Sequence, residues 1–190
     1  MRAFLALPVT PPAFDQGVRL VERLCESIAG VRWVRPEGLH VTLHFFASLG
    51  DDAAATVVDA ARAAARDTAP YRAQLGGLGC FPREGDERVL WMGMLQGEAE
   101  TAALQRATEG ALAQQGFPVE QRRFRPHVTL GRPRQRFSDA ERRRWAGFAA
   151  EALPPFAVEE VRLYRSHPGP GGSRYEVLES VPLGGVSAAR

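Results

Sequence analysis

The 190-residue sequence contains no lysine, and all 24 of its basic residues are arginines. Without a lysine, no Schiff base can form with a carbonyl substrate or with pyridoxal phosphate, and no lysyl-adenylate can carry a nucleotide. The Gly-Lys-Ser/Thr end of a P-loop is missing for the same reason. The absence of lysine therefore argues against P-loop nucleotide hydrolysis and against ATP-dependent ligation.

Cysteines and long apolar runs are also scarce. The two cysteines, Cys25 and Cys80, have no metal-type spacing, and Cys25 falls on an apolar stripe that predicts the buried face of a helix. No run approaches the roughly 18 to 20 apolar residues of a membrane span. The opening MRAFLALPV is short and lacks the small-residue cleavage pattern of a signal peptide, so we interpret it as a strand. These features predict a reduced, cytoplasmic protein.

The remaining composition, 45% apolar and 24% charged, is that of a globular domain. Periodicity and turn residues predict strands at 2–8, 31–35, 39–46, 71–78, 88–95, 125–131, 156–165 and 174–181. They predict helices at 12–29, 52–67, 98–115 and 138–151, with Asp51 capping the second and Ser138, followed by Glu141, capping the last. This alternation predicts two α/β lobes related by duplication, one in each half of the chain, with a crossover near 95–100.

The tetrapeptide HVTL occurs twice, at 40–43 and 127–130, and supplies two of only four histidines. On a strand, residues i and i+2 point to the same face, so each copy presents an imidazole and a hydroxyl on one side. In the first copy we expect Leu39, Val41, Leu43 and Phe45 on the buried face, and His40, Thr42 and His44 on the other. In the second, His127 and Thr129 lie opposite Val128 and Leu130.

Two imidazoles with pKa values near 6.5 suit paired acid and base catalysis near neutral pH. If the lobes are related by a pseudo-twofold axis, His40, His127, Thr42 and Thr129 meet across one cleft. The histidines then exchange protons with water and a leaving oxygen, and the threonine hydroxyls donate to phosphoryl oxygens. The repeat therefore predicts in-line displacement at a phosphodiester, although a single His-x-Thr on a strand is usually an ordinary residue pair.

A metal site is the other interpretation of the histidines. His40 and His44 are four residues apart, but on a strand rising about 3.3 Å per residue this places them roughly 13 Å apart, too far to share one ion. HExxH, CxxC and aspartate clusters are absent. We therefore expect no metal and no cofactor, with His44 lining the cleft or exposed and His167 solvated in the turn SHPGPG.

Positive charge is concentrated around the second copy of HVTL. Residues 121–144 contain nine arginines and two acidic residues, a local net charge of +7 in a chain of net charge +2. Planar guanidinium groups bind phosphate bidentately, so we predict Arg125 and Arg132, which flank the motif, as phosphate ligands and an RNA backbone as partner. We expect the residues 142–144 to form a solvated helix face. The candidates for stacking on a base are Phe45, Phe46, Trp91, Phe124 and Tyr164.

The doubled motif resembles the 2H phosphoesterase superfamily, and within it the bacterial RNA 2′,3′-cyclic phosphodiesterase family, long called 2′-5′ RNA ligase. The resemblance runs through MRAFLAL, LHVTLHFF, FRPHVTLGR and the closing RLYRSHPGPGGSRYEVLESVPL, nearly the whole chain. One departure is FFASLGD, where the family usually has Phe-Leu-Gly directly after the first motif.

The resemblance implies an α+β fold, with residues 1–190 forming a single bilobal domain whose antiparallel sheets line a V-shaped central cleft, with helices outside. It implies metal-free hydrolysis of RNA 2′,3′-cyclic phosphates to 2′-phosphomonoesters. In that pattern His40 protonates the leaving 3′-oxygen, His127 activates water, and Thr42 and Thr129 hold the phosphoryl oxygens, near Arg125 and Arg132. The reverse-type reaction, ATP-independent 2′-5′ ligation, is also implied, and the internal symmetry suggests a monomer.

Two other hypotheses remain at the level of sequence. In one, the same site acts on small cyclic nucleotides, on an ADP-ribose cyclic phosphate or on 2′-5′ oligonucleotides. In the other, the chain is a nucleotide- or RNA-binding module with weak catalysis, although retention of both histidines and both threonines argues against it.

Overall fold

The computed structural model describes residues 1–120, 122–169 and 172–184. Nine strands in these residues form one antiparallel sheet in the order β7-β4-β5-β6-β3-β1-β8-β9, with β2 beside β6. The strands are β1 (Arg2–Pro8), β2 (Val31–Trp33), β3 (His40–Phe46), β4 (Tyr71–Arg83), β5 (Asp86–Gln96), β6 (Val128–Pro133), β7 (Phe156–Val158), β8 (Glu160–His167) and β9 (Arg174–Pro182).

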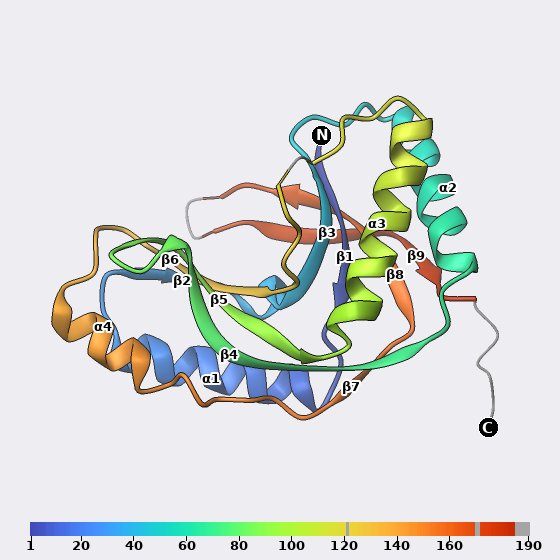
Figure 1. Cartoon of the computed structure of the whole chain (residues 1–190). Helices are drawn as coiled ribbons and strands as arrows, with labels where there is room; N and C mark the ends of the chain where they lie inside the picture. Colours follow the sequence, from blue (N-terminus) through green and yellow to red (C-terminus); the bar gives the residue numbers. More distant parts are fainter. Residues whose placement is uncertain (121, 170–171, 185–190) are drawn as a thin grey trace, which may run out of the picture.

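Helices cover the outside of this curled sheet in two groups. They are α1 (Ala13–Ser27), α2 (Ala53–Arg66), α3 (Glu98–Gln114) and α4 (Asp139–Ala146), with a single 3₁₀ turn, η1 (Pro36–Gly38). In Figure 1, α2 and α3 lie side by side at one end of the molecule, whereas α1 and α4 lie below the strands. The prediction of an α+β fold with antiparallel sheets and outer helices is confirmed.

The two sides of the sheet do not correspond to the two halves of the chain. The prediction of two lobes, one in each half, is therefore wrong. One side consists of β3, β1, β8 and β9, and the other of β6, β5, β4 and β7. Because β1 lies between β3 and β8, the last two strands return to the side on which the chain began. Within the sheet of the described residues, the two sides meet at the pair of β3 and β6. Strand β3 begins at His40, and β6 begins directly after His127.

Most predicted elements are present, with corrections at their ends. Ser138 and Glu141 form the expected capping box of α4, in which Glu141 N–H donates to Ser138 Oγ over 3.3 Å. The N-cap of α2 is Asp52 instead of Asp51, and its side chain makes no capping bond. The predicted last helix ends early, at Ala146, and the predicted strand 156–165 divides into β7 and β8.

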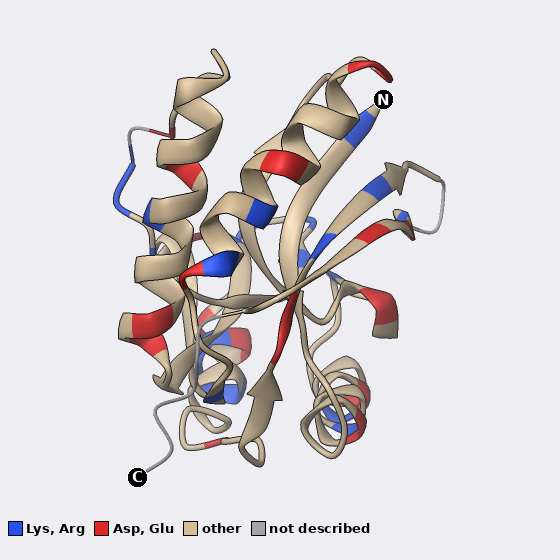
Figure 2. Cartoon of the chain, turned by 90° about the vertical axis from the view of Figure 1, so that its right-hand side faces the viewer, with Lys and Arg blue, Asp and Glu red and all other residues tan. Residues whose placement is uncertain are grey.

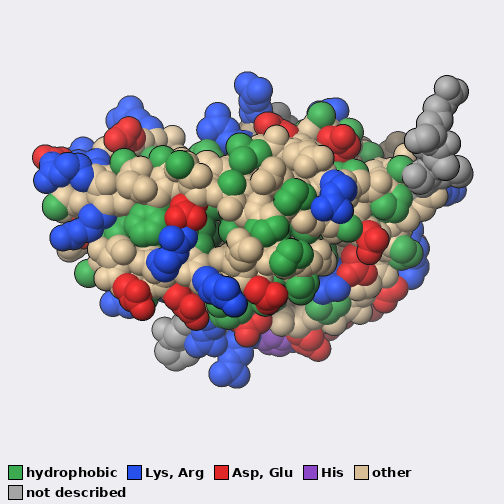
Figure 3. Space-filling model, turned by 90° about the horizontal axis from the view of Figure 1, so that it is seen from below, with side chains coloured by type: hydrophobic (Ala, Val, Ile, Leu, Met, Phe, Trp, Pro, Cys, Tyr) green, Lys and Arg blue, Asp and Glu red, His purple; other side chains and the backbone are tan. Residues whose placement is uncertain are grey.

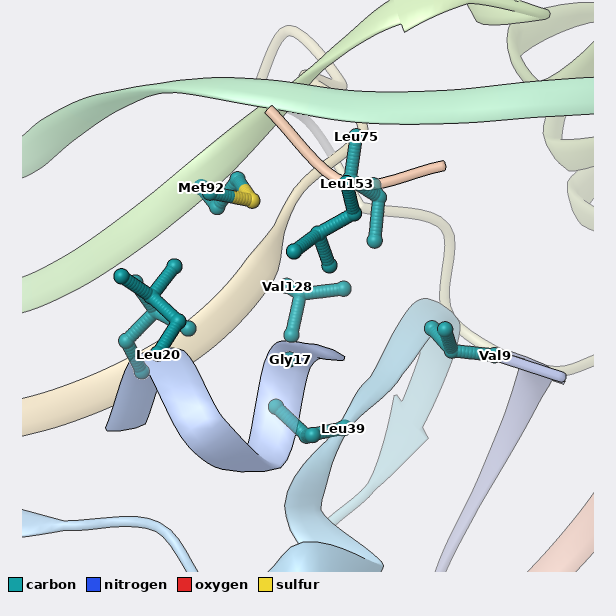
Figure 4. A pocket seen from close by; sticks show the side chains of 9 residues that line it. Val9, Gly17, Leu20, Leu39, Leu75, Met92, Val128 and Leu153 are labelled. Atoms are coloured by element: carbon teal, nitrogen blue, oxygen red, sulfur yellow. The ribbon is translucent and has the colours of Figure 1, made fainter. Parts of the chain in front are cut away.

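Helix α1 packs tightly beneath the motif strands. Leu20 and Leu24 are buried as the apolar stripe predicts, but Cys25 is exposed, since it lies at the edge of that stripe. Gly17 lets the helix approach the sheet, because an added Cβ would lie 3.1 Å from a methyl carbon of Leu39. A cavity of about 10 Å³ remains between α1 and the sheet, lined only by apolar side chains that include Val128 (Figure 4). Such a void is too small and too apolar to hold water.

A β-bulge interrupts β3 at the last residue of the first motif. Across β1, Ala6 pairs with Thr42 but Leu5 pairs with His44, so Leu43 is an extra residue. The alternation of faces reverses there. His44 is buried, whereas Phe45 is 47% exposed beneath the guanidinium of Arg2, the opposite of what strict alternation predicts. The prediction of His44 as a cleft-lining or exposed residue is therefore wrong.

Candidate active site

The two HVTL copies meet at the centre of the sheet. Val41 of β3 pairs directly with Val128 of β6, and both valines are buried on the side of the core. Continuing this antiparallel register by one residue in each direction sets His40 opposite Thr129 and Thr42 opposite His127. The four polar side chains are half-buried and share the face opposite the valines.

This pairing has a local twofold axis that passes between the two valines. The axis exchanges the motifs, so each histidine faces the threonine of the other copy. The two histidines are then diagonal neighbours across the strand pair, with backbones about 7–8 Å apart. The structure thus brings His40, Thr42, His127 and Thr129 together.

Both imidazoles are held in the same way by the backbone. His40 Nδ1 lies 3.3 Å from the carbonyl oxygen of Glu37, and His127 Nδ1 lies 2.7 Å from that of Arg125. Because a carbonyl oxygen can only accept, Nδ1 carries the proton in each ring and Nε2 keeps its lone pair. Each copy therefore offers Nε2 for proton transfer.

His40 packs against aromatic rings. Phe4 stacks on its imidazole with ring centroids 4.6 Å apart, and the ring of Tyr164 lies near both, 5.0 Å from Phe4 and 5.8 Å from His40. Tyr175 meets the imidazole edge-on at 5.3 Å. The pKa of His40 is lowered to about 4, chiefly by burial and to a smaller extent by the nearby His127, whereas the Glu37 carbonyl acts in the opposite direction.

His127 has different neighbours. Phe81 meets its ring edge-on at 5.1 Å, and the ring of Trp91 lies tilted at 6.2 Å. Burial is the largest cause that lowers its pKa, and the positive charges of Arg132 and Arg125 lower it further. The carbonyl of Arg125 acts in the opposite direction by accepting the Nδ1 proton.

Trp91 needs a glycine opposite it to occupy this place. Trp91 pairs with Thr129 on β6 and with Gly79 on β4. A Cβ on Gly79 would lie 2.2 Å from a ring carbon of Trp91, so no other residue fits without moving the indole. The indole Nε1 is buried and has no hydrogen-bond partner among the described residues. The glycine-rich stretch 75–80 lies within β4, and the pairing of β4 with β5 shifts register on both sides of Leu75.

The two arginines predicted as phosphate ligands lie beside the second copy and are exposed. The guanidinium of Arg125 lies 5.7 Å from the centroid of Trp91. Arg132 is on β6, three residues beyond Thr129, and pairs with Arg32 of β2. Both positive charges act on His127, as its lowered pKa shows. The arginines that follow residue 121 run beside α3 in Figure 2, and Gln121 itself lies outside the described residues.

The arginines of α4 are not all solvated. Arg142 is an exception to the predicted exposed face, because its guanidinium pairs with the buried Glu87 at 2.9 Å and with Asp139 at 2.8 Å. Burial raises the pKa of the Glu87 carboxyl, but the backbone N–H of Gly85 and the guanidinium of Arg142 together keep it below its usual range. Arg143 and Arg144 are exposed, as predicted. Over the face that α1 and α4 cover, acidic and basic side chains are interspersed (Figure 3).

The remaining candidates lie away from the motif pair. His44 is bonded to Glu109 inside the molecule at 2.6 Å, and His167 pairs with Glu176 at 2.9 Å on the surface. The predicted turn after His167 includes residues 170–171, which lie outside the described residues. Of the aromatic candidates, Trp91 and Tyr164 are part of the surroundings of the histidines, whereas Phe46 and Phe124 pack on the core.

Sequence reasoning missed Phe4, Tyr175 and Phe81. Phe4 is in an apolar strand, where alternation alone shows that it faces away from Leu5 and Leu7 but not what it meets. Its small cluster with Ala6, Tyr164 and Tyr175 forms only when β8 and β9 return beside β1. No local pattern indicates that contact.

Neither a metal centre nor a membrane span is found in the part of the chain that the structure describes. Across residues 1–120, 122–169 and 172–184, no group of three or more His, Cys, Asp or Glu side chains is arranged to hold a metal ion. Within the same ranges, none of the helices combines the length and the apolar character that crossing a membrane requires.

Comparison with known proteins places this arrangement in a family. The sequence model of the 2′-5′ RNA ligase superfamily matches residues 12–170. An RNA 2′,3′-cyclic phosphodiesterase of Methanothermobacter thermautotrophicus is 32% identical over 182 residues, 94% of this chain and 97% of the relative. One of Geobacillus stearothermophilus is 30% identical over 98% of this chain, which spans only 59% of that relative's length.

Solved structures show the same fold. A protein of Thermus thermophilus superposes with a TM-score of 0.81 at 25% identity, covering 98% of this chain and all of the other. E. coli LigT has the same fold, with a TM-score of 0.75 at 23% identity over 96% of this chain and 97% of its own. With a family match over most of its length and a full-length relative above 30% identity, the chain belongs to the 2′-5′ RNA ligase superfamily.

Proposed function

We propose that this protein hydrolyses RNA 2′,3′-cyclic phosphodiester ends to 2′-phosphomonoesters without a metal ion. Family membership and the names of several relatives support the cyclic phosphodiesterase activity. The single observation that carries the mechanism is the pairing of Val41 with Val128. This pairing puts two identically tethered imidazoles and two hydroxyls on one face of the sheet.

The reaction follows from the roles that the two imidazoles can take. His127 Nε2 accepts a proton from water as the water oxygen forms a bond to phosphorus. The bond from phosphorus to the 3′-oxygen breaks, and protonated His40 Nε2 donates its proton to that oxygen. The product is a 2′-phosphomonoester and a free 3′-hydroxyl, and proton exchange with solvent restores both rings. Each acid or base contributes about 10²–10⁴-fold to the rate.

The substrate itself supplies the charge that the acid needs. In the free protein the pKa of His40 is about 4, so its imidazole is mostly neutral at pH 7. A phosphodiester carries a negative charge, and an opposite charge within about 4–6 Å favours the protonated imidazole. Thr42 and Thr129 donate to the non-bridging oxygens, and Arg125 and Arg132 hold the RNA phosphates. Protonation of the acid is therefore coupled to substrate binding.

The same chemistry can run with a different nucleophile. A 5′-hydroxyl in the place of water would join two RNA ends through a 2′-5′ linkage without ATP, and hydrolysis dominates because water is far more abundant. One chain supplies both motifs, so we propose that the monomer is the active unit. The free cysteines, Cys25 and Cys80, fit a reducing cytoplasm.

The test is an assay with a short RNA that ends in a 2′,3′-cyclic phosphate, with EDTA and without ATP. Products are separated into 2′- and 3′-monophosphates, and His40→Ala and His127→Ala are run beside the wild-type protein. We expect a 2′-phosphate from the wild type and a loss of about 10²–10⁴-fold in each variant. A cyclic mononucleotide in a parallel reaction distinguishes RNA from small nucleotides as substrate. Turnover that survives both substitutions would contradict the proposal.

A further inference from the structure

Glu109 is a buried carboxylate that no step of the proposed reaction uses. It is on α3, and only 7% of its surface is exposed. Its Oε1 accepts from His44 Nδ1 at 2.6 Å and from Gln105 Nε2 at 3.3 Å. Its Oε2 accepts from the backbone N–H of Glu120 at 3.2 Å. Buried carboxylates are costly unless every oxygen is bonded, so these contacts are specific features of the fold.

The bond to His44 connects Glu109 with the strand that carries the first motif. His44 is two residues beyond Thr42 on β3, on the opposite side of the bulge at Leu43. The bulge turns the His44 ring inward, where it lies against Phe46 with ring centroids 4.4 Å apart. Glu109 therefore fixes the strand at the place where the bulge sets the direction of His40 and Thr42.

The bond from the Glu120 N–H connects Glu109 with the residues that precede the second motif. Glu120 lies between α3 and β6, five residues before Arg125. The carbonyl of Arg125 holds His127 Nδ1, so the backbone at Arg125 sets the position and the tautomer of that ring. The segment is also anchored by apolar contacts, since Phe117 packs edge-on against Phe46 at 5.6 Å and Phe124 packs on the core.

We propose that Glu109 is a positioning residue that sets the two catalytic histidines relative to one another. It ties the strand of the first motif to the segment that delivers the second, and it contacts neither imidazole of the motif pair. This role rests on the proposed function, because it is the two-histidine reaction that needs the spacing. A misplacement of about 1 Å far from the chemistry can lower a rate by about 10²-fold.

The substitution Glu109→Gln separates positioning from packing. Glutamine has the same shape, but its amide has one acceptor oxygen and a donor group in place of two acceptor oxygens. With His44 Nδ1 as the donor, it can keep the bond to His44 or the bond to the Glu120 N–H, but not both. The substitution thus breaks the link while the volume of the site is unchanged.

Glu87→Gln is a control at another buried carboxylate. Glu87 is 5% exposed, and its Oε1 accepts from the backbone N–H of Gly85 and from Arg142, whereas its Oε2 has no hydrogen-bond partner among the described residues. It is at the tip of the β4–β5 hairpin and touches neither motif strand. Thermal unfolding of both variants is measured first, so that activity is compared at temperatures where both are folded.

We expect Glu109→Gln to lower kcat on cyclic-ended RNA by about 10- to 100-fold, with KM changed less than about twofold. Glu87→Gln can keep both bonds of Oε1 through its amide oxygen, and it should keep kcat. Equal kcat values for the two variants, or a change confined to KM, would overturn the positioning role. The wild type is assayed in parallel, so that failure of the proposed function appears separately, as no wild-type turnover.

A second readout does not depend on turnover. The ¹⁵N signals of the four imidazoles report tautomer and order, and His40→Ala and His127→Ala assign the motif pair. We expect Glu109→Gln to shift or broaden the His127 signals, although Glu109 does not touch that ring, and Glu87→Gln to leave them unchanged. His44→Asn, whose amide can still donate to Glu109, should retain more activity than His44→Leu. Unperturbed His127 signals in Glu109→Gln would overturn the proposal even if the protein proved inactive on RNA.

Discussion

The two HVTL copies share a sequence and a backbone geometry, but they differ in their surroundings. In both, Nδ1 of the histidine is bonded to a nearby backbone carbonyl. His40 lies in a stack of aromatic rings formed with Phe4 and Tyr164, with no arginine among the causes of its lowered pKa. His127 meets aromatic edges and is flanked by Arg125 and Arg132.

This difference separates two properties that the repeat alone cannot distinguish. Proton transfer depends on what the two copies share, namely the tautomer of the imidazole and the face of the sheet on which Nε2 lies. In the function that we propose, phosphate recognition is concentrated at the second copy, because Arg125 and Arg132 lie there. We therefore expect the copies to be equivalent in the chemical step and different in binding, which four experiments can test.

The largest expected effect is symmetric. Thr42→Val and Thr129→Val each remove a hydroxyl that donates to a phosphoryl oxygen, and each should lower kcat by about 10²–10³-fold. Thr→Ser at either position keeps the hydroxyl and should retain most of the activity. Steady-state kinetics on cyclic-ended RNA provide the measurement. A large effect at one threonine and none at the other would show that the copies are not equivalent in the chemical step.

The arginines should break the symmetry. Arg125→Ala and Arg132→Ala each remove a charged hydrogen bond of about 1.5–3 kcal/mol, so KM should rise roughly 10- to 100-fold with a smaller change in kcat. The carbonyl of Arg125 remains in the alanine variant, so the tether of His127 is kept. Arg143→Ala, on the exposed surface of α4, is the control and should have little effect. KM values that do not distinguish the three variants would contradict the assignment.

The pH dependence should report both lowered pKa values at once. The productive state has one protonated and one neutral imidazole, and kcat/KM follows the free enzyme. With the pKa of His40 at about 4 and that of His127 below its usual range, this state is most populated below pH 6.5. Above that pH, kcat/KM should fall by up to about tenfold per unit. The profile of kcat should lie at higher pH, because the bound phosphate anion raises the pKa of an imidazole. Coincident pH profiles of kcat and kcat/KM would mean that substrate binding does not raise the pKa of an imidazole.

The smallest expected effect is on stability. Between pH 6.5 and pH 4, His40 stays neutral in the folded protein but gains a proton in the unfolded chain. The free energy of unfolding therefore decreases as the pH falls, by at most about 1.4 kcal/mol per pH unit. His40→Phe removes this proton uptake and keeps a ring against Phe4. In urea unfolding, the variant should gain about 1–2 kcal/mol relative to the wild type between pH 7 and pH 5. The same difference at both pH values would show that burial of His40 does not set its pKa.

Local sequence patterns predicted the secondary structure and the chemistry because both depend on residues close together in the chain. The capping box at Ser138, the buried stripe of α1 and the exposed His-x-Thr face all follow from spacings of two to four residues. The same reasoning failed at Leu43, because a bulge arises from pairing with β1 and changes no residue type. It therefore placed His44 and Phe45 on the wrong faces.

Long-range contacts were beyond that reasoning in two other places. The division of the sheet into two sides depends on the return of β8 and β9 beside β1, which no hydrophobic period encodes. The exposed arginine face expected at residues 142–144 failed at Arg142, because its partner Glu87 lies on a hairpin far away in the sequence.

The sequence by itself determined that two His-x-Thr pairs would lie on strand faces, that arginines would flank the second, and that no lysine chemistry was available. These features are properties of residue type and of a two-residue period. The tertiary structure decided that Val41 pairs with Val128, which rings surround each histidine, and that Glu109 joins the two motif segments. Those outcomes depend on contacts between residues far apart in the chain, where burial and hydrogen bonding of the whole fold select one register among many.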